Sequence, residues 1–198
     1  MTALLGLVLA GGRSSRMRED KAALTYGQRP QLELAFEMLA PFVSRTFVSV
    51  REDQRDDPLR AGFPQIVDGP DVGGPIAGIM AAQAAEREAA WLVVACDLPL
   101  LETATLTQLI AGRDCGRLAT AFRSVSDGLP EPLCAIYEPA SREPMLRFVS
   151  TGISCPRRFL IAHDVVLLAP ASPWALVNAN TPEELAAARQ ALAARESA

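Results

Sequence analysis

Short apolar runs alternate with stretches of helical periodicity along most of the chain. Most of these runs are too apolar to belong to a sheet with one solvated face. Between two of them, residues 31–43 place Leu32, Ala35, Phe36 and Leu39 at the spacing of one helix face. The alternation predicts an α/β fold with a largely parallel sheet. The predicted strands are 4–10, 46–50, 65–68, 91–96, 117–122, 132–137, 164–168 and 175–178.

Two further helices carry N-terminal signals. Pro75 follows Gly74 and precedes good helix formers, so we expect a helix to start at Pro75. Near the C-terminus, TPEELAAARQALAAR has Thr181 as N-cap, Pro182 at the first helical position and Glu184 three residues after the cap. This arrangement is a capping box and predicts a second helix start.

The domain organisation follows from length and composition. The chain has 198 residues, 49% of them hydrophobic and 21% charged, which is enough to bury a full core. There is no repeat or linker-like tract, so we expect one domain over 1–198. The range 114–160 is less regular and contains the turn-rich SDGLPEP, which leaves room for a small lobe that faces a substrate.

Charge and apolar run lengths exclude several classes of protein. A net charge of −4 and a pI near 5.1 argue against a nucleic-acid partner, which needs clustered basic residues. No uninterrupted apolar stretch approaches the roughly twenty residues of a membrane helix. The first apolar run has no basic residue before it and is not a signal peptide. We therefore expect a cytoplasmic protein without a membrane partner.

The cysteines do not indicate a metal or redox site. Cys96, Cys115, Cys134 and Cys155 are about twenty residues apart and form no CxxC pair. Buried free thiols in a reducing cytoplasm are the interpretation that this spacing favours.

The first predicted strand runs directly into LAGGRSSRMREDK, residues 9–21. Gly11 and Gly12 leave backbone N–H groups accessible to an anion, and Arg13, Arg16 and Lys21 add positive charge. No GK[ST] follows, so this is not a Walker loop, and the glycine spacing is not GxGxxG. The stretch is a candidate phosphate cradle, with a plain surface turn as the alternative.

Polar residues follow three other predicted strands. In open α/β sheets, ligands bind at the carboxyl ends of strands, so these positions are candidates for a site. Asp97 is placed to hold hydrated Mg²⁺, and Asp68 precedes the glycine-rich loop GPDVGGP. Asn178 and Asn180 could give a neutral oxygen to a metal. Each of the four is also a common turn or cap residue.

Five stretches carry a joint pattern: LAGGRSSRMREDKAAL, VDGPDVGGPIAGI, VVACDLPLL, PLCAIY and NANTPEEL. Together they resemble the molybdenum cofactor guanylyltransferases, within the nucleotide-diphospho-sugar transferase type of fold. The resemblance implies a single-domain, Rossmann-like nucleotidyltransferase of GT-A type. It also implies a Mg²⁺-dependent transfer of GMP from GTP to the terminal phosphate of molybdopterin cofactor, with release of pyrophosphate. Other enzymes that make or accept the molybdenum cofactor are the implied protein partners.

The same resemblance implies roles for individual residues. Arg16 and Lys21 would neutralise the triphosphate, Asp68 would lie at the nucleotide, and Asp97 would bind Mg²⁺. LAGG, where related cytidylyltransferases more often have LAAG, favours a purine. Residues implied at the guanine and phosphates are Leu9, Ala10, Gly11, Gly12 and Arg13, with Lys21, Asp68 and Asp97; those on the metal or acceptor side are Asn178, Asn180, Arg157 and Arg158. For the last two arginines, a solvated surface is the alternative.

This chemistry needs no general base, because the acceptor phosphate is already ionised near neutral pH. His163 is therefore expected to be structural. Two positions depart from the family pattern: Arg18 stands where glycine is usual, and Val50 where a polar residue is common. The alternatives are a nucleotidyltransferase of the same fold with CTP and the pterin, or with a sugar or alcohol phosphate, and a non-catalytic nucleotide-binding protein.

Overall fold

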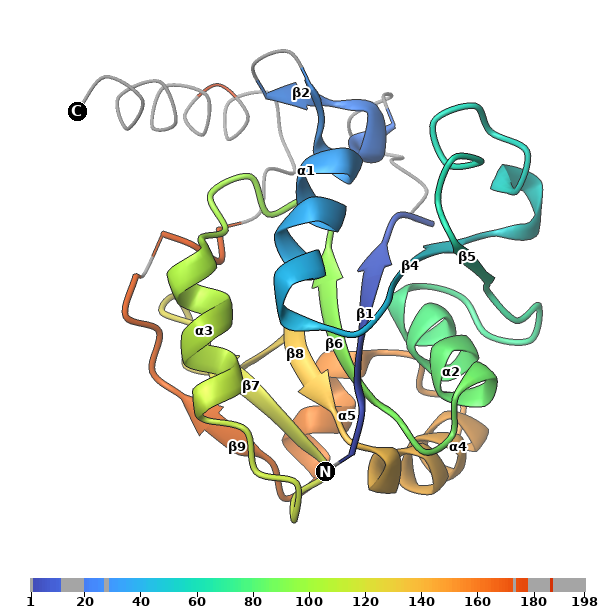
Figure 1. Ribbon diagram of the computed structural model, residues 1–198. Helices are drawn as coiled ribbons and strands as arrows, with labels where there is room; N and C mark the ends of the chain where they lie inside the picture. Colours follow the sequence, from blue (N-terminus) through green and yellow to red (C-terminus); the bar gives the residue numbers. More distant parts are fainter. Residues whose placement is uncertain (1, 12–19, 27–28, 173, 178–185, 187–198) are drawn as a thin grey trace.

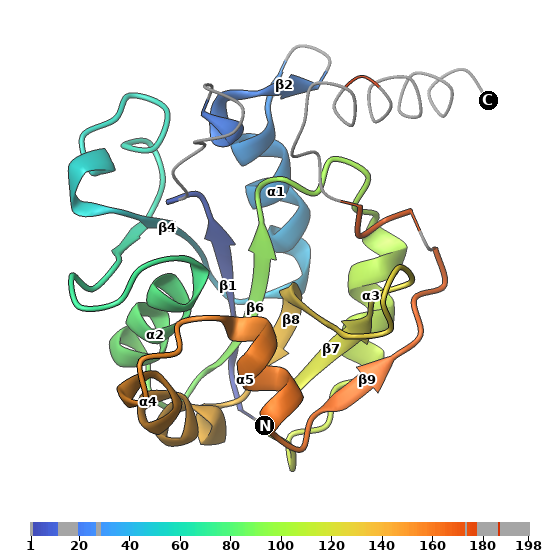
Figure 2. The same ribbon diagram turned by 180° about the vertical axis from the view of Figure 1, so that it is seen from behind.

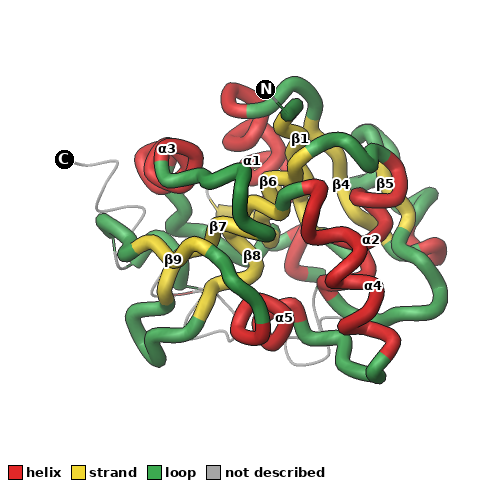
Figure 3. Tube along the Cα trace, turned by 90° about the horizontal axis from the view of Figure 1, so that it is seen from below, coloured by secondary structure: helices red, strands yellow, loops and turns green. Residues whose placement is uncertain are grey.

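A central sheet with helices on both faces forms the body of the molecule (Figure 1). The computed structural model describes residues 2–11, 20–26, 29–172, 174–177 and 186. Among these residues, seven strands form the sheet in the order β5-β4-β1-β6-β8-β7-β9, which Figure 3 shows end to end. They are β1 (Leu4–Leu9), β4 (Thr46–Val50), β5 (Gln65–Val67), β6 (Ala90–Ala95), β7 (Ala119–Arg123), β8 (Pro130–Tyr137) and β9 (Val166–Leu168).

The sheet is mostly parallel, as the sequence predicts. Strand β1 pairs in parallel with β4 and β6, β4 with β5, and β7 with β9. Strand β8 runs antiparallel to both of its neighbours, β6 and β7. A separate antiparallel pair, β2 (Thr25–Tyr26) and β3 (Arg29–Pro30), precedes the first helix. The α/β fold class is therefore confirmed.

Helices cover the two faces in two groups. One face carries α1 (Gln31–Leu39) and α3 (Thr103–Ala111). Figure 2 shows the other face with α2 (Pro75–Ala85), α4 (Arg142–Ser150) and α5 (Pro156–Ala162). Short 3₁₀ helices connect these elements: η1 (Lys21–Ala23), η2 (Ala40–Phe42), η3 (Glu52–Gln54) and η4 (Pro139–Ser141).

Each face of the sheet packs into its own apolar cluster. All six residues of β6 are buried. Leu92 and Val94 belong to the cluster that includes Leu32 of α1, whereas Trp91 belongs to the cluster that includes Ile79 of α2. Burial on both faces explains why β6 has no alternation of apolar and polar residues.

Several local predictions can be compared with the structure. The helix predicted at Pro75 begins there, after Gly74 with a φ of 81°. The α-helix predicted over 31–43 ends at Leu39 and continues as 3₁₀, because Pro41 has no N–H for the α-helical ladder. Of the helix predicted after Thr181, only Ala186 is described, and it is helical.

The strand predicted over 175–178 is wrong for its described residues, 175–177. They form a turn, in which the N–H of Ala175 bonds to Ser172 O and the N–H of Val177 to Trp174 O. Both bonds go to a residue three positions earlier, and they use N–H donors that a strand would offer to a neighbouring strand. Apolar runs this short do not distinguish a strand from a turn or helix segment by pattern alone.

The range 114–160 contributes β7, β8 and α4 to the body of the molecule and contains most of α5. The single-domain organisation and the substrate-facing lobe stay predictions.

In the described part of the chain, no helix is long and apolar enough to cross a membrane. All four cysteines are described, and none forms a disulfide. Cys96 and Cys134 are buried as expected, but the expectation is wrong for Cys115 and Cys155, which are exposed. His163 directly follows α5, and its Nδ1 lies 2.8 Å from the carbonyl oxygen of Phe159 in that helix.

Candidate functional site

A cavity of about 1020 Å³ lies at the carboxyl ends of four neighbouring strands, β1, β4, β5 and β6. The arrows of β1 and β6 in Figure 1 point towards this end of the sheet. Because these strands are parallel, residues distant in sequence meet at one edge. The structure brings five predicted site residues to the cavity wall: Leu9, Ala10, Gly11, Asp68 and Asp97.

Gly11 and Asp68 approach each other closely across the cavity wall. A Cβ on residue 11 would lie 3.0 Å from Asp68 Oδ2. The other carboxylate oxygen, Oδ1, accepts a hydrogen bond of 2.6 Å from the buried Ser49 hydroxyl at the end of β4. The absence of a side chain at Gly11 thus lets the ends of β1, β4 and β5 converge on one carboxyl group.

Burial raises the pKa of Asp68 above its ordinary value. The removal of the carboxyl group from water is the largest influence, and it disfavours the charged form. The hydrogen bond from Ser49 and the positive charge of Arg51 lower the pKa and offset part of this effect. The Asp68 charge is therefore costly to the folded chain, which is typical of a group retained for function rather than for stability.

We expect Asp68→Asn to unfold at higher urea concentration than the parent at neutral pH. Because the folded pKa is raised, the contribution of Asp68 to stability is present below the ordinary value of 3.8 and is lost as the pH rises through the folded value. The gain in the free energy of unfolding of Asp68→Asn over the parent should therefore grow from acidic to neutral pH. Urea unfolding of both proteins across this range measures it.

Asp56→Asn is the control for this measurement, because it removes the same charge from an exposed position in the chain between β4 and β5. A gain in stability of Asp68→Asn over the parent that does not change with pH, or that grows towards acidic pH, would contradict the pKa argument.

The N-terminus of α2 also faces the cavity. Gly73, Gly74 and Pro75 line it, and Gly74 is the N-cap of this eleven-residue helix. The positive φ of Gly74 and the fixed φ of Pro75 set the direction in which the helix starts. The first N–H groups of a helix and its dipole favour an anion at this end. The glycine-rich loop after Asp68 thus positions a helix start that can bind phosphate.

Asp97 follows β6, and its partly exposed side chain belongs to the wall of the cavity. Among the described residues, no group of three or more His, Cys, Asp or Glu side chains is placed to hold a metal ion. Mg²⁺ bound with a nucleotide needs only one or two protein carboxylates, since water and phosphate oxygens complete its ligands. The Asp97 carboxylate fits such a site.

Two arginines from the chain between β4 and β5 are functional candidates that our sequence analysis missed. Arg51 Nη1 donates to the carbonyl oxygen of Gly11, and its Nε and Nη2 bond to Asp53 at 2.8 and 2.9 Å. Arg51 directly follows a predicted strand, so the strand-end rule applied to Asp68 and Asp97 would have found it. Arg60 has a side chain only 1% exposed and contacts Ala10, Asp20 and Asp57. No local signal marks it.

The departure at Val50 also has a structural explanation. The Val50 side chain is fully buried in the cluster beneath α1. Its carbonyl oxygen accepts a hydrogen bond of 2.8 Å from the N–H of Asp68. Position 50 therefore holds the backbone of Asp68 in place, and its side chain belongs to the core.

A second cavity of about 410 Å³ adjoins the first and shares Pro75 and Leu133 with it. Arg157 lines this cavity and bonds to Asp127 and Glu131, at 2.9 Å each. Arg158 is exposed on α5. The two arginines are therefore not equivalent, since Arg157 alone of the pair is in the cavity wall.

Of the remaining predicted site residues, Lys21 alone is described, and it begins η1. Gly12, Arg13, Arg16, Asn178 and Asn180 lie outside the described residues, as does Arg18. Their roles stay predictions.

Comparison with known proteins identifies the family. Residues 6–166 match the family described as "MobA-like NTP transferase domain". A protein from Trichormus variabilis named "Probable molybdenum cofactor guanylyltransferase" is 32% identical over 189 residues, which cover 94% of this chain and 90% of that protein. The "Molybdenum cofactor biosynthesis bifunctional protein" of Synechocystis is 32% identical over 183 residues. This chain spans 53% of the length of that relative.

Solved structures show the same fold. "Molybdopterin-guanine dinucleotide biosynthesis protein A" from Archaeoglobus fulgidus has a TM-score of 0.80 and 25% identity, with 96% of this chain and 98% of that chain covered. A CMP:2-keto-3-deoxy-manno-octonic acid synthetase has a TM-score of 0.74 at 13% identity and shares the fold alone. With the family match spanning β1 to the start of β9, this chain belongs to the MobA-like NTP transferase family and is a nucleotidyltransferase.

Proposed function

We propose that this nucleotidyltransferase transfers GMP from GTP to the terminal phosphate of molybdopterin cofactor and releases pyrophosphate. The observation that supports it most is the meeting of Gly11, Asp68 and Asp97 around one cavity of about 1020 Å³. Relatives 29–33% identical over nearly the whole chain are named molybdenum cofactor guanylyltransferases.

The reaction requires one bond to form and one to break. An oxygen of the acceptor phosphate attacks the α-phosphorus of GTP, and the bond from that phosphorus to the oxygen of the pyrophosphate group breaks. The acceptor oxygen is ionised near neutral pH, so no side chain has to remove a proton. Positioning of the two phosphates and neutralisation of the departing charge then provide most of the catalysis.

Individual residues have separate proposed roles in this transfer. The backbone from Leu9 to Gly11 and the N-terminus of α2 would hold the nucleotide, with Asp68 beside it. Arg16 and Lys21 would neutralise the triphosphate. Asp97, with Asn180 as a weaker candidate, would hold Mg²⁺. When bound, this ion supplies positive charge to the phosphates.

The second cavity is our proposed acceptor site. It is adjacent to the proposed nucleotide cavity, because Pro75 and Leu133 line both cavities. Apolar side chains such as Leu98 and Leu176 suit a flat ring. Arg157, which also bonds to Asp127 and Glu131, is the side chain of this wall proposed to contact an anionic acceptor. Arg158, Asn178 and Asn180 are proposed at the outer part of the same site. We also propose contacts with other enzymes of cofactor synthesis, which the family resemblance implies, and a cytoplasmic location.

Pyrophosphate release from GTP, CTP, ATP and UTP, each with Mg²⁺ and molybdopterin cofactor, tests this function. We expect release from GTP, dependent on the acceptor, because the family resemblance implies guanine selection. Comparable reactions without acceptor control for simple hydrolysis. Release from CTP instead would contradict the nucleotide assignment, and binding of GTP without release under any of these conditions would contradict the transfer itself.

A further inference from the structure

Two arginines from the chain between β4 and β5 bind the carbonyl oxygens of consecutive residues at the end of β1. Arg51 donates to Gly11 O. Arg60 donates to Ala10 O through Nε at 3.3 Å and Nη2 at 3.0 Å. Both carbonyls are in the wall of the large cavity, since Ala10 and Gly11 line it. The chain after β1 is thus held from outside by two guanidinium groups.

Arg60 also reaches the far end of the same segment. Its Nη2 donates to Asp20 Oδ1 at 2.8 Å, and Asp20 lines the cavity as well. Ala10 stands just before residues 11–19 and Asp20 just after them. One guanidinium group therefore joins Ala10 and Asp20, the residues on either side of positions 11–19.

The burial of Arg60 indicates that its position is closely fixed. Its side chain is 1% exposed, and its Nη1 donates to Asp57 Oδ1 at 3.0 Å. A planar guanidinium with donors in a rigid fork can bind three acceptors in fixed directions, which a flexible ammonium cannot do. A buried charge of this kind is retained at a cost in desolvation, so a role in specifying local geometry is a reasonable expectation.

These contacts have two consequences for an anionic ligand. In a trans peptide, the N–H of Gly11 is directed opposite to the C=O of Ala10, so Arg60 fixes the direction of this donor at the cavity wall. Arg60 also pairs with the Asp20 carboxylate, a negative charge that would otherwise repel phosphate. Both effects favour nucleotide binding without direct contact between Arg60 and the nucleotide.

We propose that Arg60 is a positioning residue for the nucleotide: it holds Ala10 and Asp20 together at the wall of the large cavity and so fixes the direction of the Gly11 N–H. This inference rests on the proposed function, because it takes the large cavity as the nucleotide site. A purely structural Arg60 would contribute to the stability of the fold and leave nucleotide affinity unchanged. The two roles are separable by measurement.

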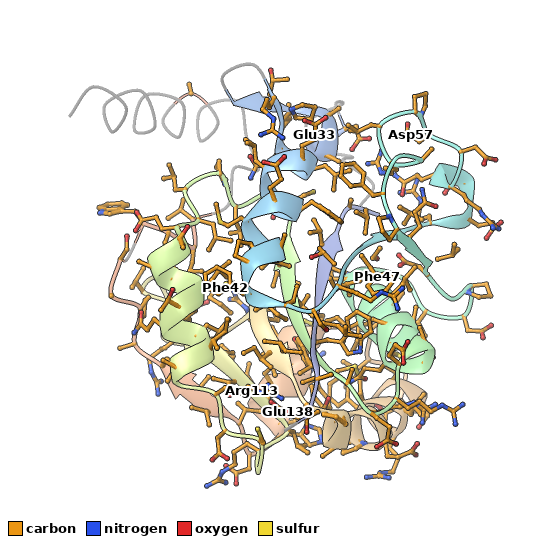
Figure 4. All side chains as sticks on the ribbon, in the orientation of Figure 1. Glu33, Phe42, Phe47, Asp57, Arg113 and Glu138 are labelled. Carbon is orange, nitrogen blue, oxygen red and sulfur yellow. The ribbon has the colours of Figure 1, made fainter. Side chains whose placement is uncertain are left out.

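Arg113 provides a matched control. It too is a largely buried arginine, with a 13% exposed side chain, and it binds both carboxylate oxygens of the buried Glu138 at 2.6 and 2.9 Å. Figure 4 shows Arg113 and Glu138 at the end of the sheet opposite to Asp57, the partner of Arg60. Loss of Arg113 should therefore destabilise the fold without reaching the cavity.

The test compares GTP binding with Mg²⁺, by calorimetric titration, in the full-length parent, Arg60→Met, Arg60→Lys and Arg113→Met, alongside urea unfolding. We expect Arg60→Met to raise the dissociation constant about tenfold or more and Arg60→Lys to raise it less. Arg113→Met should unfold at lower urea concentration yet bind GTP within about twofold of the parent.

The outcomes separate the inference from the proposed function. If the parent binds GTP and the folded Arg60 variants bind it within about twofold of the parent, the positioning role is overturned and the proposed function stands. If Arg60→Met does not fold, Arg60→Lys decides by the same criterion. If the parent does not bind GTP, the proposed function fails, and the nucleotide role of Arg60 falls with it.

Discussion

Replacement of Asp97 by alanine is expected to reduce pyrophosphate release from GTP at least about 1000-fold. Asp97 follows β6 and is the carboxylate proposed to hold Mg²⁺ in the large cavity. Without it, the triphosphate would lack a positioned cation when negative charge moves to the pyrophosphate. Initial rates at saturating GTP and molybdopterin cofactor, over a series of Mg²⁺ concentrations, measure the effect.

Asp97→Asn and Asp164→Ala complete this experiment. The asparagine keeps an oxygen ligand without its charge, so we expect partial activity that needs more Mg²⁺. Asp164, with a 77% exposed side chain, pairs with Arg117 beside β9 and controls for the loss of an acidic residue away from the cavity. Parent-like activity of Asp97→Ala at every Mg²⁺ concentration would refute the assignment, whereas removal of Mg²⁺ by EDTA should abolish the parent activity.

Replacement of Gly78 by valine should lower both stability and activity. Gly78 lies in α2, and a Cβ there would collide with Ser49 Oγ and lie 2.8 Å from Leu9 Cδ2. We expect a loss of about 3 kcal/mol in the free energy of unfolding, the upper end of the usual range for overpacking. Because the Ser49 hydroxyl binds Asp68, its displacement should also raise the KM for the nucleotide.

Gly112→Val is the matched control for this substitution. A Cβ at Gly112 would meet the side chain of Leu168, whose flexible end can move, and this contact is between α3 and β9. We expect a smaller loss of stability and an unchanged KM. Urea unfolding and steady-state kinetics of both variants measure these effects. Equal changes of KM in the two variants would argue against a path from Gly78 through Ser49 to the site.

Several sequence predictions agree with the structure because they depend on residues that are close together in the chain. Strand 46–50 and the helix start at Pro75 match the structure to the residue, because an apolar run and a Gly-Pro step act within a few positions. Asp68 and Asp97 were found by a rule that links strand ends to one edge of a parallel sheet. The same rule, applied to Arg51, would have added a third charged residue.

Other features depend on contacts that no local pattern records. Ser49 is an ordinary strand residue until β5 places Asp68 within 2.6 Å of its hydroxyl. Arg60 is one of several charged residues between β4 and β5, and its partner Ala10 is 50 positions away in the chain. The apolar run 175–177 forms a turn, in which the N–H groups of Ala175 and Val177 bond to the carbonyl oxygens of Ser172 and Trp174 instead of to a neighbouring strand.

The alternation of strands and helices, the glycine-rich stretch after β1 and the two carboxylates at strand ends could be predicted from the residues alone, because periodicity and turn chemistry act over short ranges. The packing of the folded chain decided which strands are neighbours, including the antiparallel β8 between β6 and β7. It also decided that Arg60 is buried against Ala10 and Asp20. Such pairings gain their free energy from burial and hydrogen bonds between distant segments, and these exist only once the sheet has formed.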